Sequence, residues 1–498
     1  MTVPFKQVPS GDQIRVPLFY AEVDNSQANT ATQSQRTLII GQITAAGTGV
    51  PNIPIISQGV SDAKTVGGQG SMLALMTAAY RNSDNFGEVW YLPLADDPSA
   101  VAATGSLNFT AAATAVGVVF LYIAGQRITQ NVSPSLTAAQ IATALVATIN
   151  AGADLPVTAA VDGTTTSKVN VTAKNKGLAG NEIDIRLNYQ GLPGGESTPA
   201  GLAVTIVPMA GGLVNPVLTT GLSNLADKPF DFIVLPYTDT TSMDALKGFL
   251  NDVTGRWAWS SGIYGHFFAG YRGTLGASTT FGTTRNDQHG SVMPFYDSPS
   301  PAWILAADLA GAAAVSLRAD PGLPLQTVAL STFLAPPPQS RFALTDRNVL
   351  LFDGMSTFTV ADDGTVAIEN LITTYQKNAF GQPDNSYLQV ETLFLLMYCI
   401  RRLKGVVTSK YGRKKLADNG TRFAPGANIV TPNTIRADQI AEYTEMEYEG
   451  YVQDSTAFAA GLIVERDDTN PNRVNELWDG VLINGLRIFA LLAQFRLQ

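Results

Sequence analysis

LINGLRIFALLAQFRLQ, residues 482–498, closes the chain and decides how the rest of the sequence is interpreted. Between Leu486 and Ala493 the only charged residue is Arg487. Successive side chains of a strand point to opposite faces, and here both faces would be apolar. One face would carry Leu486, Ile488, Ala490 and Leu492, and the other Phe489, Leu491, Ala493 and Phe495. Because a solvated tail is usually polar, the pattern predicts a strand that enters a sheet, either in its own chain or in a neighbouring one.

A second terminal strand is predicted near the start of the chain. IRVPLFYAEVD, residues 14–24, is β-prone, and Pro17 confines it to a sheet edge or a bulge. Its apolar positions are Ile14, Val16, Leu18 and Tyr20. The polar stretch NSQANTATQSQ, residues 25–35, has no periodicity and is typical of a linker. Fully extended, this linker reaches roughly 35–40 Å, so the strand could pair far from the domain that follows.

Between the two ends, predicted strands alternate with helices. TLIIGQ (37–42), a GGQGS turn (67–71) that opens a helix, and EVWYLPL (88–94) predict a βαβ unit with parallel strands. Residues 105–213 are instead rich in Ala, Thr, Val and Gly and hold several strand candidates around one helix. The α/β pattern resumes at FDFIVLPY (230–237). We therefore expect an α/β multidomain protein with a mixed α/β core, an inserted α+β domain and terminal strand-exchanging arms.

The C-terminal portion adds a hairpin and two oppositely charged helices. FTVADDGTVAIE (358–369) places an Asp-Gly turn between two alternating runs. The long apolar helix that follows has Ser386 and Gln389 as its predicted capping box and ends in a basic cluster. The next helix, about 434–450, is acidic. Strand GLIVER (461–466) then leads through DDTNPN, expected to be a linker, into the final segment.

These transitions divide the chain into predicted units, and the exits of the inserted domain, DDPSA (96–100) and AGGLVNP (210–216), are marked by Gly and Pro. The units are an N-terminal arm and linker (1–35), a first segment of the α/β core (36–104), the inserted α+β domain (105–215), a second segment of the α/β core (216–340), a C-terminal domain (341–466), and a C-terminal linker with the donated strand (467–498).

The composition is typical of a chain whose surface is partly covered by neighbouring subunits. Charged residues make up 15% of the 498 residues, against roughly 25% in soluble domains, and charge is depleted at interface cores. A large α/β protein with small surface residues is the alternative. The net charge of −9 argues against nucleic acid as a partner. We find no signal-peptide pattern and no apolar run that approaches the roughly 20 residues of a membrane span, so we expect cytoplasmic synthesis without membrane insertion.

Signals for catalysis and for metal binding are poor. Two histidines and the single Cys399 argue against a His- or Cys-based zinc site, and no G-x-S-x-G motif is present. His266 lies in an apolar run and is predicted to be a core residue, whereas His289 is predicted to be exposed in a loop. We expect no enzyme activity, cofactor or metal. The alternative is a hydrolase that pairs one of these histidines with a serine.

The sharpest charge feature is a basic cluster at the end of the apolar helix. Its members are Arg401, Arg402, Lys404, Lys410, Arg413, Lys414 and Lys415. Such a run is usually a solvated face. The alternative is a docking patch for an acidic partner surface, where it would set orientation more than affinity.

Four long stretches carry a family resemblance. They are GGQGSMLALMTAAYRNSDNFGEVWYLPL (67–94), FTVADDGTVAIENLITTYQ (358–376), TSKYGRKKLADNGTRFAPGANIVTPNTIRAD (408–438), and VERDDTNPNRVNEL with LINGLRIFALLAQFRL (464–497). Together they resemble the tail sheath proteins of contractile bacteriophages, specifically the Mu-like group. The inserted domain carries less of this signal.

The resemblance implies a structural subunit that stacks as hexameric rings around a tail tube and contracts to drive the tube through the host envelope. The implied partners are further copies of the chain, the tail tube protein, and baseplate and tail terminator proteins. The implied location is the virion tail, after synthesis and assembly in the host cytoplasm. The sheath of a headless contractile device, bacteriocin-like or belonging to a secretion system, is the alternative.

The resemblance also implies that both terminal arms add strands to neighbouring subunits. The arm positions would be Ile14, Val16, Leu18, Tyr20, Leu486, Ile488, Phe489, Leu491, Leu492 and Phe495. The residues alone modestly favour pairing within the chain, and the resemblance reverses that preference. The candidate receiving strands are the hairpin 357–369 and the strand 461–466. Contraction would be a rigid-body movement with hinges at 25–35 and 467–472. Because the C-terminal portion lies innermost in this family, the basic cluster is the candidate tube-facing patch.

Overall fold

The apolar run TLIIGQ forms β1 (Thr37–Gln42), which is buried along its whole length inside the largest sheet. The computed structural model describes residues 35–497. The order of this central sheet is β13-β12-β11-β1-β3-β2, parallel except where β2 meets β3. The remaining strands are β2 (Ile55–Ile56), β3 (Val89–Leu94), β11 (Phe232–Val234), β12 (His266–Arg272) and β13 (Gly290–Phe295). The predicted βαβ unit is confirmed, since β1 and β3 are parallel neighbours.

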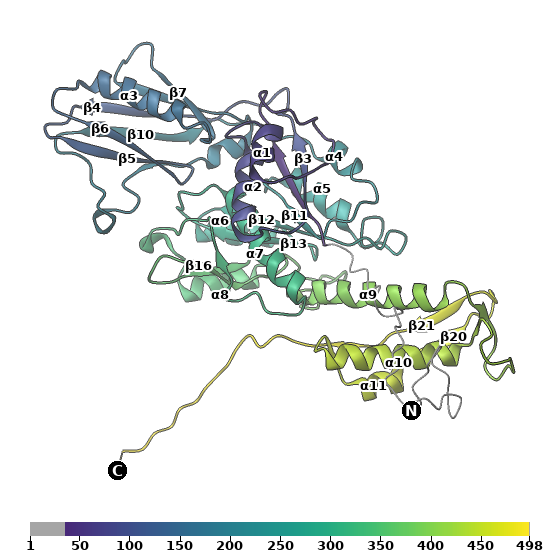
Figure 1. Ribbon diagram of the computed structural model, residues 1–498. Helices are drawn as coiled ribbons and strands as arrows, with labels where there is room; N and C mark the ends of the chain where they lie inside the picture. Colours follow the sequence, from purple (N-terminus) through teal and green to yellow (C-terminus); the bar gives the residue numbers. More distant parts are fainter. Residues whose placement is uncertain (1–34, 498) are drawn as a thin grey trace, which may run out of the picture.

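Helices cover the central sheet, and small residues let them approach closely (Figure 1). α7 (Ala302–Ala319) packs on α2 (Met72–Ser83), where a Cβ on Gly311 would lie 2.7 Å from the Tyr80 carbonyl oxygen. A Cβ on Gly270 of β12 would lie 2.4 Å from the Ala302 carbonyl oxygen. The other helices of the core are α1 (Val60–Gly67), α4 (Thr219–Ser223), α5 (Thr240–Leu250) and α6 (Leu275–Thr283).

α7 is apolar because it is the central core helix. Within residues 35–497 it is the one helix long and apolar enough to cross a membrane, and 78% of it is buried inside the protein. The sequence expectation that no apolar run approaches this length was therefore wrong for α7. Burial on nearly all sides explains its composition, as a helix that is apolar all round is a core helix or a membrane span.

The GGQGS segment is a tight turn, as predicted, but it joins two helices. Gly68 and Gly70 have φ of +84° and +72°, which a glycine adopts without strain. Ser71 is the N-cap of α2, and its Oγ accepts a hydrogen bond of 3.2 Å from the Ala74 amide. The predicted connection from a strand was wrong, because α1 ends at Gly67 directly before the turn.

Residues 104–210, here called the lobe, form two antiparallel sheets with a hydrophobic core of their own. One sheet has the order β10-β4-β8-β7 and the other β6-β5-β9. Figure 1 shows the lobe projecting from the central sheet. Its elements are β4 (Thr104–Ala111), β5 (Gly117–Ile123), β6 (Gln126–Val132), α3 (Ala138–Ala151), β7 (Val157–Val161), β8 (Lys168–Ala173), η2 (Leu178–Glu182), β9 (Ile185–Leu187), η3 (Leu192–Gly194) and β10 (Ala203–Ala210).

A small sheet with the order β14-β16-β15 continues from the core. The predicted hairpin 358–369 is confirmed as β15 (Thr357–Val360) paired antiparallel with β16 (Val366–Asn370). β14 (Ala329–Leu330) lies on the other side of β16. The Ser356 amide donates to the Val292 carbonyl, so this sheet adjoins the central one at β13. η4 (Pro338–Ser340) and α8 (Leu344–Phe352) lie between β14 and β15 in the chain.

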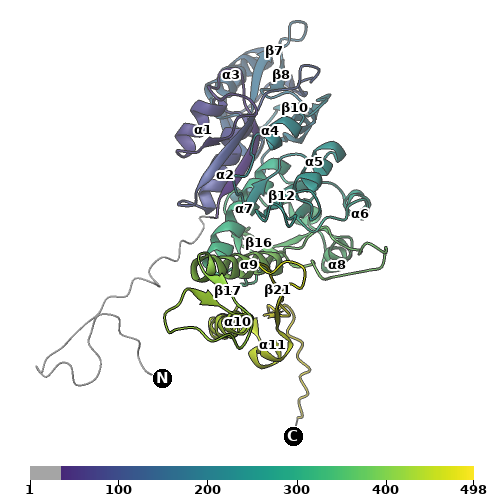
Figure 2. The same cartoon turned by 90° about the vertical axis from the view of Figure 1, so that its right-hand side faces the viewer.

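Residues 390–482, here called the C-terminal module, lie at the end of the molecule opposite the lobe (Figure 2). The module contains α9 (Val390–Tyr411), β17 (Lys415–Leu416), β18 (Ile429–Val430), α10 (Pro432–Tyr448), β19 (Val452–Gln453), α11 (Ser455–Gly461), β20 (Ile463–Arg466), β21 (Val474–Leu477) and β22 (Val481–Leu482). Its strands form three separate pairs, β17-β18, β19-β22 and β20-β21.

α9 joins the module to the core because it is apolar on two sides. Phe394 belongs to the central core and stacks on Phe232 with ring centroids 4.9 Å apart. Leu395 and Cys399 face the other way into the core of the module. The predicted capping box was wrong, since α9 begins at Val390 after Gln389 and the Ser386 hydroxyl donates instead to Asp384.

Candidate functional site

The C-terminal segment is held as far as Arg487 and is free beyond it. The Ile483 amide donates to the Tyr451 carbonyl at 3.1 Å, and Gln326 Nε2 donates to the Leu486 carbonyl at 3.1 Å. Arg487 then forms an ion pair of 2.6 Å with Glu391. Residues 483–487 are called the arm root below, and residues 488–497 the free segment. Figure 1 shows the free segment extending away from the body.

The free segment exposes nearly all of its apolar surface. It pairs with no strand of residues 35–497. The exposed fractions lie between 77% and 88% for Ile488, Phe489, Leu491, Leu492, Phe495 and Leu497. Leu486 of the arm root is also exposed. The other predicted arm positions, Ile14, Val16, Leu18 and Tyr20, lie outside the described residues.

The hairpin β20–β21 offers open strand edges in the same module. Its two strands pair with one another and with no other strand in the described part of the chain. Ile463 and Leu477 are directly opposite each other and are 50% and 58% exposed. Open edges carry unpaired amide and carbonyl groups that can accept a further strand.

Residues 467–472 form the turn of this hairpin, so the prediction of a linker there was wrong. Asp467 Oδ1 accepts the amides of Thr469 and Asn470 at 2.9 and 2.8 Å. Hydrogen bonds from Thr469, Asn475 and these amides hold the pKa of Asp467 well below its usual range. Such Asx geometry is typical of a defined turn rather than a flexible spacer. The chain becomes free only after Arg487.

Three members of the predicted basic cluster form ion pairs within the chain, and two of these, Arg401 and Arg402, are half-buried. Arg401 pairs with the buried Asp231 at 2.6 Å, which ties α9 to the core. Arg402 pairs with Glu442 of α10 at 2.5 Å and also with Glu449 at the C-cap of α10. These half-buried guanidinium groups hold the module together, and their inclusion in a free patch is therefore corrected.

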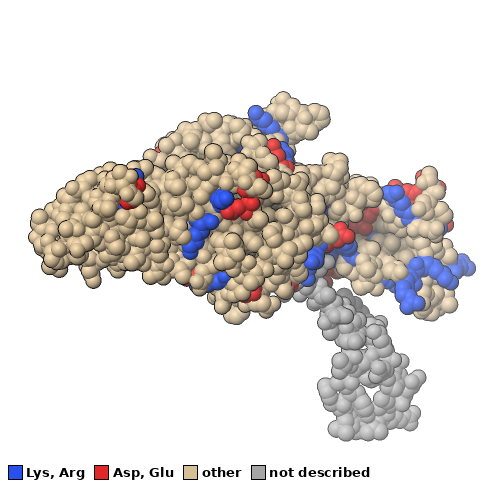
Figure 3. All heavy atoms as spheres, turned by 90° about the horizontal axis from the view of Figure 1, so that it is seen from above, with Lys and Arg blue, Asp and Glu red and all other residues tan. Residues whose placement is uncertain are grey.

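The remaining members of the cluster lie at the tip of the module. Lys410 is 3.7 Å from Asp438. Lys404, Arg413, Lys414 and Lys415 are exposed and make no ion pair with any residue of 35–497. On the face seen in Figure 3, basic side chains gather at this end of the molecule beside some acidic ones, whereas few charged side chains are visible on the lobe.

The two histidines are buried, which corrects the prediction that His289 is exposed. His266 Nε2 lies 2.9 Å from Ser291 Oγ, and both residues are fully buried in the central sheet. Burial lowers the pKa of His266 well below its usual value. His289 lies 2.7 Å from Asp252 and stacks on Trp257. A nucleophile must reach its substrate, and the His266–Ser291 pair is enclosed by the core, so these contacts are structural.

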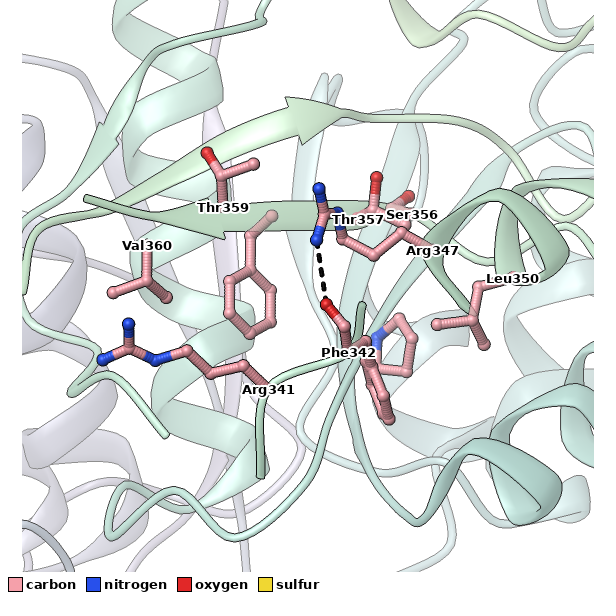
Figure 4. Close-up of a pocket in the computed structure, with 10 residues that line it drawn as sticks. Arg341, Phe342, Arg347, Leu350, Ser356, Thr357, Thr359 and Val360 are labelled. Carbon is pink, nitrogen blue, oxygen red and sulfur yellow. Dashed lines mark hydrogen bonds between the residues drawn. The ribbon is translucent and has the colours of Figure 1, made fainter. Parts of the chain in front are cut away.

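Cys399 is a core residue, as predicted, and burial raises the pKa of its thiol to about 11. Over residues 35–497 no group of three His, Cys, Asp or Glu side chains could hold a metal ion. The cavity in Figure 4 measures about 190 Å³ and is lined by β15, Arg341, Phe342, Arg347 and Leu350. Arg347 already donates to the Phe342 carbonyl at 2.8 Å and pairs with Glu369 at 2.7 Å. The cavity is smaller than the roughly 300–1,000 Å³ of most ligand sites.

Sequence reasoning missed the Glu391–Arg487 pair, although a signal was present. Each is a single charge inside an apolar run, Glu391 in VETLFLL and Arg487 in LRIFALLA. A lone charge in such a run usually has a partner when it is buried. The sequence could therefore have indicated that both residues are paired, but not that they pair with each other.

Comparisons with known proteins agree with this architecture. Residues 211–374 match the family described as phage tail sheath protein central domain, and residues 382–496 match the phage tail sheath C-terminal domain. The Mu-like prophage FluMu tail sheath protein of Haemophilus influenzae is 39% identical over 498 residues, covering 99% of this chain and 100% of the relative.

Solved structures with lower identity are also similar. The crystal structure of the sheath tail protein from Desulfitobacterium hafniense has 13% identity and a TM-score of 0.47, covering 94% of this chain and 100% of the other. A chain in the cryo-EM structure of the anti-feeding prophage baseplate in the contracted state has 10% identity and a TM-score of 0.48, with both chains fully covered.

The full-length identity of 39% and the two matched domains together establish what the chain is. The sequence prediction of a tail sheath protein is confirmed. This chain belongs to the phage tail sheath protein family and is a structural subunit of a contractile phage tail.

Proposed function

We propose that the subunit polymerises by donating its free segment to a sheet of a neighbouring subunit. One observation carries this proposal, namely that residues 488–497 leave the body as an apolar and unpaired segment. Burying each Ile, Leu or Phe side chain contributes about 1.5–3 kcal/mol. Main-chain hydrogen bonds would hold the donated strand, and alternate side chains would set its register.

The hairpin β20–β21 is the better receiver of the two candidates named from the sequence. In the other candidate, β16 is already flanked by β14 and β15, and the start of β15 adjoins β13. Both outer edges of β20–β21 are unpaired within residues 35–497. One edge would take the C-terminal arm of one neighbour and the other an N-terminal arm, in which Ile14, Val16, Leu18 and Tyr20 would supply the side chains.

The assembled particle would be a stack of hexameric rings around the tail tube. Contraction would then be a rigid-body rearrangement in which the exchanged strands stay paired. The C-terminal hinge, which the sequence placed at 467–472, is reassigned to the junction of Arg487 and Ile488, where contacts with the body end. The linker 25–35 remains the proposed hinge of the N-terminal arm.

The exposed lysines and arginine at the tip of the module would face the tube. Lys404, Lys410, Arg413, Lys414 and Lys415 form the reduced patch, because Arg401 and Arg402 are half-buried in ion pairs, whereas Lys410 stays exposed although it pairs with Asp438. An acidic tube surface would complement the patch and orient the subunit.

The remaining roles follow from the same assembly. The partners would be further copies, the tail tube protein, and baseplate and tail terminator proteins, without nucleic acid, cofactor, catalysis or membrane insertion. The subunit would be made in the host cytoplasm and end in the virion tail. Residues 105–215 would be an inserted domain facing away from the tube. The predicted C-terminal domain 341–466 is narrowed to the module of residues 390–482, because β15 and β16 share a sheet with β14 and pack in the central core. The boundaries of 1–35, 36–104 and 216–340 remain predictions. A headless contractile device would use the same contacts.

Deleting residues 488–498 tests the donated strand. The free segment forms no hydrogen bond or ion pair with the rest of residues 35–497 and is exposed, so the truncated subunit should melt at the temperature of the full chain. Co-expressed with its tube protein, it should form few or no sheaths in negative-stain electron micrographs. A second variant that lacks residues 1–24 tests the N-terminal arm. Normal-length, contractile sheaths from both variants would refute strand exchange.

A further inference from the structure

The arm root sits in a cradle built from three segments of the chain. Glu391 lies in the first turn of α9, and its Oε1 accepts the Leu325 amide at 2.7 Å. Its Oε2 lies 2.6 Å from Arg487 Nη2. The loop that contains Leu325 also supplies Gln326, which donates to the Leu486 carbonyl at 3.1 Å. Helix, loop and arm root therefore meet at one carboxylate.

The arm root packs closely against this cradle, in addition to forming the ion pair. A Cβ on Gly485 would lie 2.5 Å from Pro324 Cγ, so the chain passes closely over the loop. The side chains of Glu391 and Arg487 are 5% and 19% exposed. The carboxylate also lies at the N-terminal end of α9, where the helix dipole favours a negative charge. An ion pair in this setting is screened by solvent much less than one on an open surface.

Contacts between the C-terminal segment and the body stop directly after Arg487. Ile488 and the large apolar residues after it are exposed, and the free segment has no ion pair or hydrogen bond with the rest of residues 35–497. The boundary between held and free chain therefore falls at Arg487 and not at a sequence linker.

We propose that Arg487 is the anchor of the C-terminal arm, and that its ion pair with Glu391 fixes the point and the direction from which the donated strand leaves the subunit. This inference rests on the proposed strand donation. With the anchor closed, residues 488–498 reach roughly 36–40 Å. The anchor also sets which residue first meets the neighbouring sheet, and a slip of one residue would turn the opposite face inward.

The anchor further passes force from the arm to α9. Glu391 is at the start of α9, and Arg401 in the middle of the helix is paired with Asp231 of the core. A pull on the donated strand therefore reaches a helix that is fixed to the central sheet. Without the anchor, residues 484–487 would have to be ordered during assembly at a cost in conformational entropy.

A spin-label experiment on the unassembled full chain tests the anchor directly. Labels at Ile488→Cys and Asn348→Cys report the distance from the first free residue to α8, and the native Cys399 is buried. The parent should give a narrow distance distribution. Arg487→Gln and Glu391→Gln should each broaden it, the double variant should add nothing further, and Arg487→Lys should stay narrow. Arg496→Gln is the matched control, since it removes the same charge beyond the anchor.

The same variants are then assembled on tubes and counted by electron microscopy. Arg487→Gln and Glu391→Gln should each lower the yield of full-length sheaths by about ten-fold, whereas Lys176→Gln, which removes an exposed positive charge from the lobe, should not. An unchanged distance distribution in Arg487→Gln would overturn the anchor. A broadened distribution with a normal sheath yield would also overturn it, while leaving strand donation intact. Failure of strand donation itself is recognised separately, because the variant that lacks 488–498 would then assemble normally.

Discussion

The lobe and the C-terminal module differ in how far they bury their apolar residues. The lobe places its residues in a core between two sheets and α3. The module has a smaller core, and it leaves Ile463, Leu477 and the free segment exposed. The lobe therefore buries a core of its own, whereas the module leaves apolar surface that no part of residues 35–497 covers. This difference supports the proposal that the module organises assembly.

The largest expected effect comes from placing a charge on the open hairpin. Ile463→Lys puts an ammonium group on the apolar face of β20, where it would have to be desolvated beneath a donated strand. Sheath yield should fall by about ten-fold or more, with the melting temperature of the free subunit nearly unchanged. Electron microscopy and thermal unfolding measure the two quantities.

Val207→Lys is the matched control on the lobe, because Val207 lies on β10 and is 53% exposed, similar to Ile463. The same charge there should leave sheath yield within about two-fold of the parent, since surface substitutions away from interfaces have small effects. Equal losses from both variants would contradict the assignment of assembly to the module.

A smaller effect is expected from reversing charge at the tip of the module. Lys414→Glu with Lys415→Glu should weaken attachment of the sheath to the tube by roughly three- to ten-fold, and raising the salt concentration should reduce the difference. Co-sedimentation with purified tubes measures attachment. Lys176→Glu, an exposed position on the lobe, is the control. If the two lysine reversals leave attachment unchanged at low salt, the tip does not face an acidic tube.

The smallest expected effect comes from removing one of two aspartates that each hold a turn by accepting hydrogen bonds. Asp467 in the module accepts hydrogen bonds from the Thr469 hydroxyl and nearby amides, and Asp162 in the lobe accepts them from the Thr165 amide and its neighbours; these bonds hold both pKa values well below the usual range. Asp467→Ala should speed amide exchange in β20 and β21 by about three- to ten-fold. Asp162→Ala should change β7 and β8 by less than about two-fold, because β8 is also paired with β4.

The pH dependence of these turns follows from the lowered pKa values. A carboxylate with a lowered pKa in the folded protein stabilises it fully above the unfolded pKa of about 3.9. That contribution is lost as the pH falls below this value. Acidification from pH 7 to about pH 3 should therefore loosen the β20–β21 turn in the parent and have less effect in Asp467→Ala. Identical pH profiles in the two proteins would refute the role of Asp467.

Local patterns predicted much of the fold. The buried runs around β1 and β3, the Asp-Gly hairpin of β15 and β16, and the start of α2 after the GGQGS turn each depend on a few consecutive residues. The apolar free segment was also evident from its sequence. In these places the residue types and their spacing already contain the physical cause of the structure.

Several errors involve partners distant in the sequence, whereas the capping box at Ser386 was a local error. Arg402 reads as a member of a basic run, but Glu442 of α10 and Glu449 at its C-cap lie beside it in the fold. His289 follows polar loop residues, yet Asp252 and Trp257 enclose it. Residues 467–472 look like a linker until β21 returns to pair with β20. Such pairings depend on the whole fold, which a local pattern does not contain.

Amide hydrogen exchange across residues 488–497, compared between the free subunit and the assembled sheath, is the sharpest test of strand donation. In the free subunit these amides have no partner within residues 35–497, and they should exchange at the rate of an unstructured peptide. In the sheath they should be protected by about 100-fold or more, as expected of a paired strand. Rapid exchange in both states would show that the free segment is not donated to a sheet.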